Sequence, residues 1–299
     1  MANAVWIVAP EDDGAAVEVI AARIEQAGDP VAEGRVFVGG RRATSGLVLR
    51  AGDRVELWRS RGATARAAAP ASARPRIVVA ARDGEVLFAV KPADLATEPE
   101  RRGGDALVTR LASDLGGRRV HAASRLDAGV SGLVACATGP RGAARLAAAK
   151  ESGQLRRVYV AITSGVITGD GLWEGDVDGR QASTRWRARA AARGATWLDL
   201  ELITGRTHQI RVHAAAAGAP LLGDAAHGGP RRIATARGAM IELRRPMLHA
   251  TAAALLDRGP RPALAAVLPP PDDLRSTWLA LDGDPAAWEG WLPPWSSPG

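Results

Sequence analysis

The amino-acid sequence predicts an α+β fold built on a largely antiparallel or mixed β-sheet flanked by helices. Segments with the pattern of strands outnumber those with the pattern of helices, and the turns between them favour hairpins over βαβ crossovers. Hydrophobic residues make up 46% of the 299 residues, which is enough to fill a core. A chain of this length accommodates one large domain and a small one.

Residues 1–60 predict the small domain, with one helix and several strands. Ala15–Ala27 carries apolar residues at helical spacing, which predicts the helix. Val36 and Val38 alternate with their neighbours as in a strand, and Gly39-Gly40 then forms a tight turn. Gly52-Asp53 forms another turn before a last strand at Arg54–Trp58.

Residues 61–75, RGATARAAAPASARP, are rich in Ala, Arg and Pro without an apolar period, which predicts a linker. Residues 76–270 form the predicted large domain, and residues 271–299 a Pro- and Trp-rich tail. We expect the tail to be irregular and to pack its indoles on the body of the protein. The elements expected in the large domain are strands at Glu85–Val90, Leu133–Ala137, Arg157–Ile162 and Thr196–Leu202 and a helix at Arg141–Lys150.

The charge balance favours a polyanionic partner. The net charge is +7, and Lys91 and Lys150 are the only lysines, so arginine supplies nearly all of the positive charge. A codon bias explains the choice of Arg over Lys but not the excess of positive charge. Arg231, Arg232, Arg244 and Arg245 are basic residues available for a phosphate track, although any one of them more often serves as a solvated surface charge.

Several protein classes are excluded or disfavoured by composition. The single cysteine, Cys136, excludes an internal disulfide framework and is expected to be a small buried hydrophobic residue. No apolar run has the length of a membrane span, and the N-terminus lacks the features of a secretory signal, so we expect a cytoplasmic protein without membrane attachment. The five histidines have no zinc-ligand spacing, which predicts no metal.

Four segments of the large domain carry polar residues in patterns that need a chemical explanation. They are SRLDAGVSGLVA around Asp127, RRVYVAITSG at 156–165, ITGRTHQIRVHAAAAGAPLLGD at 203–224 and RRPMLHATAAAL at 244–255. In the third segment, Thr207 suits a helix N-cap and Gly218 suits the position after the helix, which predicts a helix at His208–Ala217. Arg211 then lies one turn into that helix, on a rigid support.

These four segments, in this order, resemble the signatures of the RluA-type pseudouridine synthases. The resemblance implies the pseudouridine synthase fold and an isomerase that converts uridine to pseudouridine in ribosomal or transfer RNA, acting on a flipped-out base. This reaction breaks the C1′–N1 bond and joins C1′ to C5 of the same base, so no atom is gained or lost and no cofactor is needed. The resemblance also implies that RNA is the partner and that the protein is a monomer.

Residues 1–60 resemble the S4 RNA-binding module, with Gly39 in place of the usual Asn. The first helix is poor in Arg for that module, with only Arg23 clearly in it. A small β-rich packing domain is the alternative reading of this unit.

The resemblance implies catalytic roles for Asp127, Tyr159 and Arg211. Asp127 is the single carboxylate that acts at the sugar and C5, Arg211 pairs with it and favours its charged form, and Tyr159 stacks on the target base. A glycoside hydrolase, by contrast, needs two carboxylates. The residues implied to contact the substrate are Arg125, Leu126, Arg206, His208 and Gln209.

Some readings compete with this one, and some positions depart from the family pattern. An isolated Arg-x-Asp is usually a surface ion pair, and Tyr159 on an alternating strand is ordinarily a core residue. An RNA-binding protein on the same fold that has lost turnover is the main alternative function, and a structural module is a third. The departures are Ser124, Val130, Val90, Asp94, Arg157 and His227, which bear on the identity of the substrate more than on the reaction.

Overall fold

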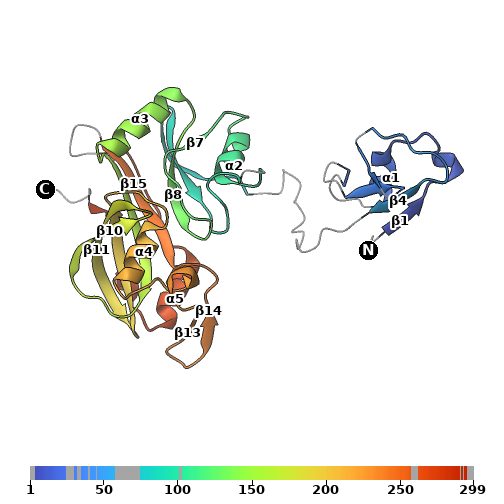
Figure 1. Cartoon of the computed structure of the whole chain (residues 1–299). Coiled ribbons are helices and arrows are strands. Elements are labelled where there is room, and N and C mark those ends of the chain that lie inside the picture. The colour runs from blue at the N-terminus through green and yellow to red at the C-terminus, as the bar shows by residue number, and fades with distance from the viewer. Residues whose placement is uncertain are drawn as a thin grey trace. The chain divides into compact units, whose positions relative to one another are not determined.

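The computed structural model divides the chain into two compact units, Met1–Pro75 and Arg76–Gly299 (Figure 1). It describes residues 4–24, 30–31, 35–39, 41–44, 46–57, 75–100, 103–256, 262–289, 291 and 293–294. Nearly all of the predicted linker at 61–75 lies outside these residues, as do Gly40, Trp58 and Trp295.

The N-terminal unit is a four-stranded antiparallel sheet with one α-helix. The strands lie in the order β1-β4-β2-β3, and the core beneath α1 includes Val17, Ile20, Leu49 and Val55. The predicted helix corresponds to α1, and residues 25–27 of the prediction lie outside the described ones. The elements are β1 (Ala4–Ile7), a 3-10 turn (Pro10–Asp12), α1 (Val17–Ile24), β2 (Val36–Val38), β3 (Arg41–Arg42) and β4 (Arg54–Leu57).

The larger unit is built on a ten-stranded mixed sheet with the order β10-β11-β12-β9-β15-β8-β6-β5, where β16 pairs with β15 and β7 with β8. The pairing of β15 with β8 is parallel and the other described pairings are antiparallel, so the predicted α+β fold with a mixed sheet is confirmed. The elements up to the centre of the sheet are β5 (Val79–Asp83), β6 (Val86–Lys91), α2 (Leu107–Asp114), β7 (His121–Ala122), β8 (Ser131–Ala137), α3 (Pro140–Glu151) and β9 (Leu155–Ser164).

The rest of this unit contains the remaining half of the sheet, a small hairpin and two helices. The elements are β10 (Asp170–Val177), β11 (Arg180–Ala192), β12 (Ala195–Leu202), α4 (Gln209–Ala216), a 3-10 turn (Ala225–His227), β13 (Arg232–Ala234), β14 (Met240–Glu242), β15 (Leu248–Leu256), β16 (Pro262–Val267), α5 (Asp272–Ala280) and a 3-10 turn (Pro285–Ala287). Each predicted strand and helix of the large domain is present, with ends that differ by at most two residues from the prediction. No helix in the described ranges is long and apolar enough to cross a bilayer.

Both faces of the central sheet are apolar because helices cover each of them. On β9, Tyr159 and Ala161 belong to one core, whereas Val160 and Ile162 belong to another on the opposite face, as their alternation predicts. The first core is closed by α2 and α4, and the opposite face is covered by α3 at one end and α5 at the other (Figure 1). The functional motifs converge on the face of Tyr159.

The C-terminal tail packs on the sheet through its indoles, as predicted, but it is more regular than expected. Trp278 is fully buried and meets Trp197 edge-on at 5.7 Å between ring centroids, and Trp288 lies 5.3 Å from Trp197. The sequence analysis assigns no helix here, yet α5 forms. Asp272 and Asp273 occupy its first turn, where acidic residues stabilise a helix, and Leu274 and Trp278 share its buried face.

Candidate active site

Asp127 and Arg211 are 84 residues apart in sequence and meet directly in the structure. Arg211 Nη1 donates a hydrogen bond of 2.8 Å to Asp127 Oδ2. Asp127 lies in the loop between β7 and β8, and Arg211 lies in the first turns of α4, where it is 9% exposed. A charged hydrogen bond of this kind holds the carboxylate in one orientation and stabilises its negative charge.

Asp224 holds Arg211 from the other edge of its guanidinium group. Arg211 Nε and Nη2 donate to the two oxygens of Asp224, each at 2.7 Å, which is the bidentate geometry that favours Arg. Burial alone would raise the pKa of Asp224, but hydrogen bonds from Arg211 and His227 outweigh it and lower the pKa. Asp224 is not among the site residues predicted from the sequence. Its position at the end of the same motif as Arg211 was the available signal.

The start of α4 differs from the prediction. Thr207 is not the N-cap, and the prediction was wrong on this point. His208 occupies that position with a left-handed φ of 54°. No side chain caps this end of α4, and the side chain of Gln209, the first helical residue, turns back so that its Oε1 accepts from Arg206 N at 3.0 Å. At the other end, Gly218 follows the helix with a φ of 73°, as predicted.

Gln209 is saturated by protein contacts. Its Oε1 also accepts from Thr204 Oγ1, and its Nε2 donates to Ser183 O and Thr184 Oγ1. An amide offers two donors and about two acceptor sites, so these bonds leave none for a substrate. Gln209 therefore fixes the motif against β11.

One cavity of about 330 Å³ collects the predicted site residues, a size typical of small-molecule sites. All of the predicted catalytic and substrate-contacting residues line it, namely Arg125, Leu126, Asp127, Tyr159, Arg206, His208, Gln209 and Arg211. Tyr159 is 4% exposed, and burial raises the pKa of its phenol. Val130, Ile210 and Leu248 supply apolar wall. The cavity thus holds two carboxylates, Asp127 against Arg211 and Glu98 near Arg125, beside apolar side chains that can contact a flat ring.

Four cations, which we call the basic rim, line the same cavity: Arg125, Lys150, Arg157 and Arg206. Their polar contacts are long: 3.4 Å from Lys150 Nζ to Ala123 O, 3.4 Å from Arg157 Nη2 to Thr204 O, 3.4 Å from Arg206 Nε to Gln181 O and 3.9 Å from Arg125 to Glu98. Burial, together with the charges of Arg157, Arg206 and Arg125, lowers the pKa of Lys150. The rim therefore holds positive charge that is weakly matched within the described residues.

Lys91, which is not among the predicted site residues, supports the loop of Asp127 through a hydrogen bond to Ala128 O. Its side chain is fully buried, and Nζ donates to Leu95 O at 2.6 Å, Pro92 O at 2.9 Å and Ala128 O at 3.0 Å. Burial and the charge of Arg245 lower its pKa to about 8, against the opposing effect of Asp127 and Asp94. Lys91 therefore fixes the residue that follows the candidate catalytic acid.

The remaining predicted residues are placed as follows. His208 lies at the cavity with Nε2 3.6 Å from Asp127 Oδ1, and its ring meets His227 edge-on. Arg231, Arg232 and Arg244 are exposed, but Arg245 is 5% exposed and paired, so the prediction of a free phosphate contact was wrong for Arg245. Cys136 is fully buried, as predicted. No cluster of three or more metal-ligating side chains occurs in the described part of the chain.

The fold and the comparisons with known proteins place the chain in a class of RNA-modifying enzymes. Residues 85–216 match the family of RNA pseudouridylate synthases. The chain is 31% identical over 230 residues to ribosomal large subunit pseudouridine synthase D of Xanthomonas campestris pv. campestris, covering 68% of this chain and 69% of that one. It is 32% identical over 228 residues to the protein of the same name from Vibrio cholerae, covering 68% and 70%.

The solved structure of human RNA pseudouridylate synthase domain containing 4 has the same fold. It aligns with a TM-score of 0.55 at 19% identity, covering 68% of this chain and 92% of that one. Together with the sequence relatives, this shows that the chain belongs to the RNA pseudouridylate synthase family. It is an isomerase that acts on RNA.

Proposed function

We propose that this protein converts a uridine of large-subunit ribosomal RNA to pseudouridine at the Asp127 cavity. The observation that carries the proposal is the 2.8 Å bond from Arg211 Nη1 to Asp127 Oδ2 inside a cavity that also contains Tyr159. The relatives named for the large ribosomal subunit support the choice of RNA. The alternative, an RNA binder without turnover, gains no support because Asp127, Tyr159 and Arg211 are present together.

In this proposal, each residue of the cavity has a definite task. Asp127 acts at the sugar and C5 of the extruded uridine, and Arg211, fixed by Asp224, holds the carboxylate in its orientation. Tyr159 lies against the base, and the apolar walls retain the uracil between cleavage of C1′–N1 and formation of C1′–C5. The proton lost from C5 balances the one gained at N1. Gln209 holds α4 in place and does not contact the substrate through its amide.

Mapping of pseudouridines in a deletion strain tests this function. We expect one or a few uridines of large-subunit RNA to lose modification, and a plasmid with the wild-type chain to restore it. A plasmid with the Asp127→Asn chain should fail to do so. Loss of modification confined to transfer RNA would show that transfer RNA, and not large-subunit RNA, is the substrate. Restoration by the Asn variant would show that Asp127 is not the catalytic acid.

The basic rim is proposed to bind the phosphates that flank the extruded nucleotide. We expect Lys150→Ala and Arg157→Ala each to weaken RNA binding and to reduce the slope of log K against log salt by about 1, because each loses one phosphate contact. Fluorescence titration at several salt concentrations measures both quantities. Arg187→Ala on β11 is the control, since Arg187 is exposed and alternates with Trp186, which packs on the cavity-side core. If the slope of log K against log salt were the same for all three variants, the basic rim would not be the phosphate-binding surface.

The roles of the outer segments complete the proposal. The N-terminal unit, residues 1–60 with its S4-like pattern, is proposed to add RNA contacts through exposed residues such as Arg41 on β3. The boundaries at 61–75, 76–270 and 271–299, the monomeric state and a cytoplasmic location stay predictions. The last follows from a ribosomal RNA substrate.

A further inference from the structure

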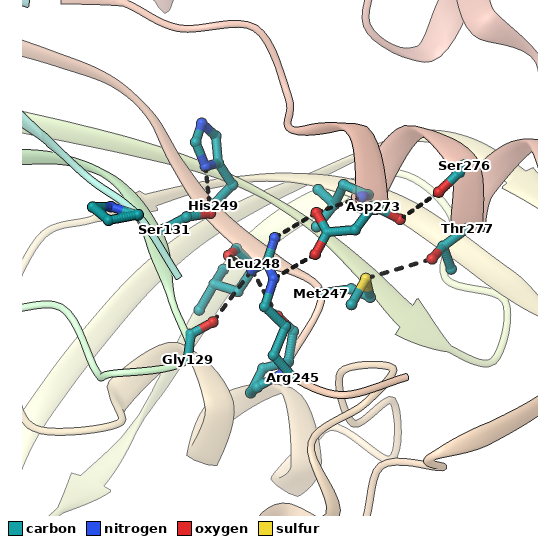
Figure 2. A network of polar contacts seen from close by, with 12 residues as sticks. Gly129, Ser131, Arg245, Met247, Leu248, His249, Asp273, Ser276 and Thr277 are labelled. Atoms are coloured by element: carbon teal, nitrogen blue, oxygen red, sulfur yellow. Dashed lines mark hydrogen bonds and ion pairs between the residues drawn. The ribbon is translucent and has the colours of Figure 1, made fainter. Parts of the chain in front are cut away.

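A second buried arginine lies behind the loop of Asp127, in a network of its own (Figure 2). Arg245, which precedes β15, is 5% exposed. Its Nε donates to Asp273 Oδ2 at 2.6 Å and its Nη2 donates to Asp273 Oδ1 at 2.7 Å. Asp273 lies in the first turn of α5, so this bidentate pair ties the C-terminal helix to the segment that enters the centre of the sheet.

The remaining terminal nitrogen of Arg245 reaches the loop of the candidate catalytic acid. Nη1 donates to Gly129 O at 3.3 Å, to Pro246 O at 3.3 Å and to Leu248 O at 3.1 Å. Gly129 is two residues beyond Asp127, and Leu248 lines the cavity. Figure 2 shows the guanidinium group between the carboxylate of Asp273 and these carbonyls. One side chain therefore joins α5, the start of β15 and the loop.

The loop is held at each of four consecutive carbonyls. Thr97 Oγ1 donates to Leu126 O at 2.8 Å, Val130 N to Asp127 O at 3.0 Å, and Lys91 Nζ to Ala128 O at 3.0 Å. Arg245 supplies the fourth donor, to Gly129. The guanidinium group of Arg245 is oriented by Asp273, a residue outside the four sequence motifs.

The backbone of Arg245 also packs against the turn that precedes Asp224, the partner of Arg211. A Cβ atom added to Gly223 would lie 2.0 Å from Arg245 O, so Gly223, with a φ of 82°, allows the two backbones to meet. Gly223 precedes Asp224, which holds Arg211. Arg245 thus contacts both the Asp127 loop and the turn that positions Arg211.

We propose that Arg245 and Asp273 are positioning residues that set the place of Asp127, so that the C-terminal helix is part of the catalytic apparatus. This rests on the proposed function. Asp273 fixes the guanidinium group of Arg245 in the orientation in which its Nη1 donates to Gly129 O. Burial would raise the pKa of Asp273, but the hydrogen bonds and charge of Arg245 outweigh it and lower the pKa, so the pair is charged. A displacement of about 1 Å at a reacting group costs on the order of 100-fold in rate.

The test is Asp273→Asn, which keeps the shape of the side chain and removes its charge. Under single-turnover conditions we expect the rate of pseudouridine formation to fall by roughly 10- to 100-fold, with RNA affinity within about threefold of wild type. Arg245→Lys keeps the positive charge but loses the bidentate guanidinium group, so its single-turnover rate should fall by a similar factor. Asp272→Asn is the control, because Asp272 is the neighbouring acid on the same helix, is exposed and pairs with Arg275 rather than with Arg245. It should retain the wild-type rate.

Hydrogen exchange gives a readout that does not depend on activity. The amide of Val130, which donates to Asp127 O, should exchange at least about tenfold faster in Asp273→Asn than in Asp272→Asn, with both assayed well below their unfolding temperatures. The positioning role would be overturned if Asp273→Asn formed pseudouridine at the wild-type rate and its Val130 amide exchanged at the wild-type rate. It would also be overturned if the variant had a lower melting temperature but an unchanged rate of pseudouridine formation. An inactive wild-type protein whose exchange still responds to Asp273→Asn would instead refute the proposed function.

Discussion

Purified protein with Asp127→Asn is expected to form no pseudouridine while its RNA affinity stays within about tenfold of wild type, roughly 1.4 kcal/mol. The Asn side chain has the same shape, and its oxygen can still accept from Arg211 Nη1, so the cavity keeps its form. What it lacks is the negative charge and the basicity that the sugar and C5 require. Chromatography of nucleosides after digestion measures turnover, and filter binding measures affinity.

Glu98→Gln is the matched control for this result. Glu98 lines the same cavity, its side chain is 41% exposed, and it lies 3.9 Å from Arg125 rather than against Arg211. We expect the Gln variant to retain turnover. If the Asn variant were as active as the wild-type chain, or if Glu98→Gln alone were inactive, Asp127 would not be the acid that acts.

Replacement of Arg211 by Met is expected to lower the free energy of unfolding by about 3–5 kcal/mol, because it leaves Asp224 buried without its main partner. Asp224 is 1% exposed, and of its ion pairs within the described residues, with Arg211 and His227, the one with His227 would remain. Urea unfolding of the variant and the wild-type chain at pH 7.5 measures the difference. Arg206→Met removes the same charge from the rim and should change stability by no more than about 0.5 kcal/mol. A loss no greater than that of Arg206→Met would contradict a structural role for the Arg211–Asp224 pair.

The pH dependence of this difference has a definite sign. In the wild-type chain the pKa of Asp224 is lower in the folded state than in the unfolded state. Its stabilising contribution is therefore present above the unfolded value of about 4 and is lost as the pH falls through the folded value. In Arg211→Met, burial without the guanidinium group raises the pKa of Asp224 in the folded state. Protonation of Asp224 at lower pH then removes its buried, unpaired charge and reduces the destabilisation of the variant. We expect the gap between the two proteins to narrow as the pH falls from 7.5 towards 4.

The parts of the site that the sequence predicts are those contained in contiguous motifs. Asp127 and Arg211 stand in long, recognisable segments, and Gly218 ends α4 by a local rule that needs no tertiary information. The alternation around Tyr159 likewise determines which face of β9 it occupies. These features depend on the identity and spacing of neighbouring residues, which are visible in one dimension.

The parts that the sequence does not predict depend on partners from distant segments. In the sequence, nothing distinguishes Arg245 from the surface arginines near it, and its role depends on α5 bringing Asp273 to it. The role of Lys91 likewise depends on the Asp127 loop, which places a carbonyl beside its Nζ. The Thr207 cap fails because the chain turns at His208, with a left-handed φ of 54°, so that the helix starts one residue later than a Thr207 cap requires. The helix α5 lies between Pro-rich stretches that hide the i, i+4 pair of Leu274 and Trp278.

Tritium release from ribosomal RNA labelled at C5 of uridine tests the central claim most directly. Formation of the C1′–C5 bond expels the C5 proton, so each pseudouridine formed releases one tritium to water. The wild-type chain should release label in proportion to the modified sites, and the Asp127→Asn chain should release none. Release that is equal for the two chains, or absent for the wild-type chain on every cellular RNA, would contradict the account.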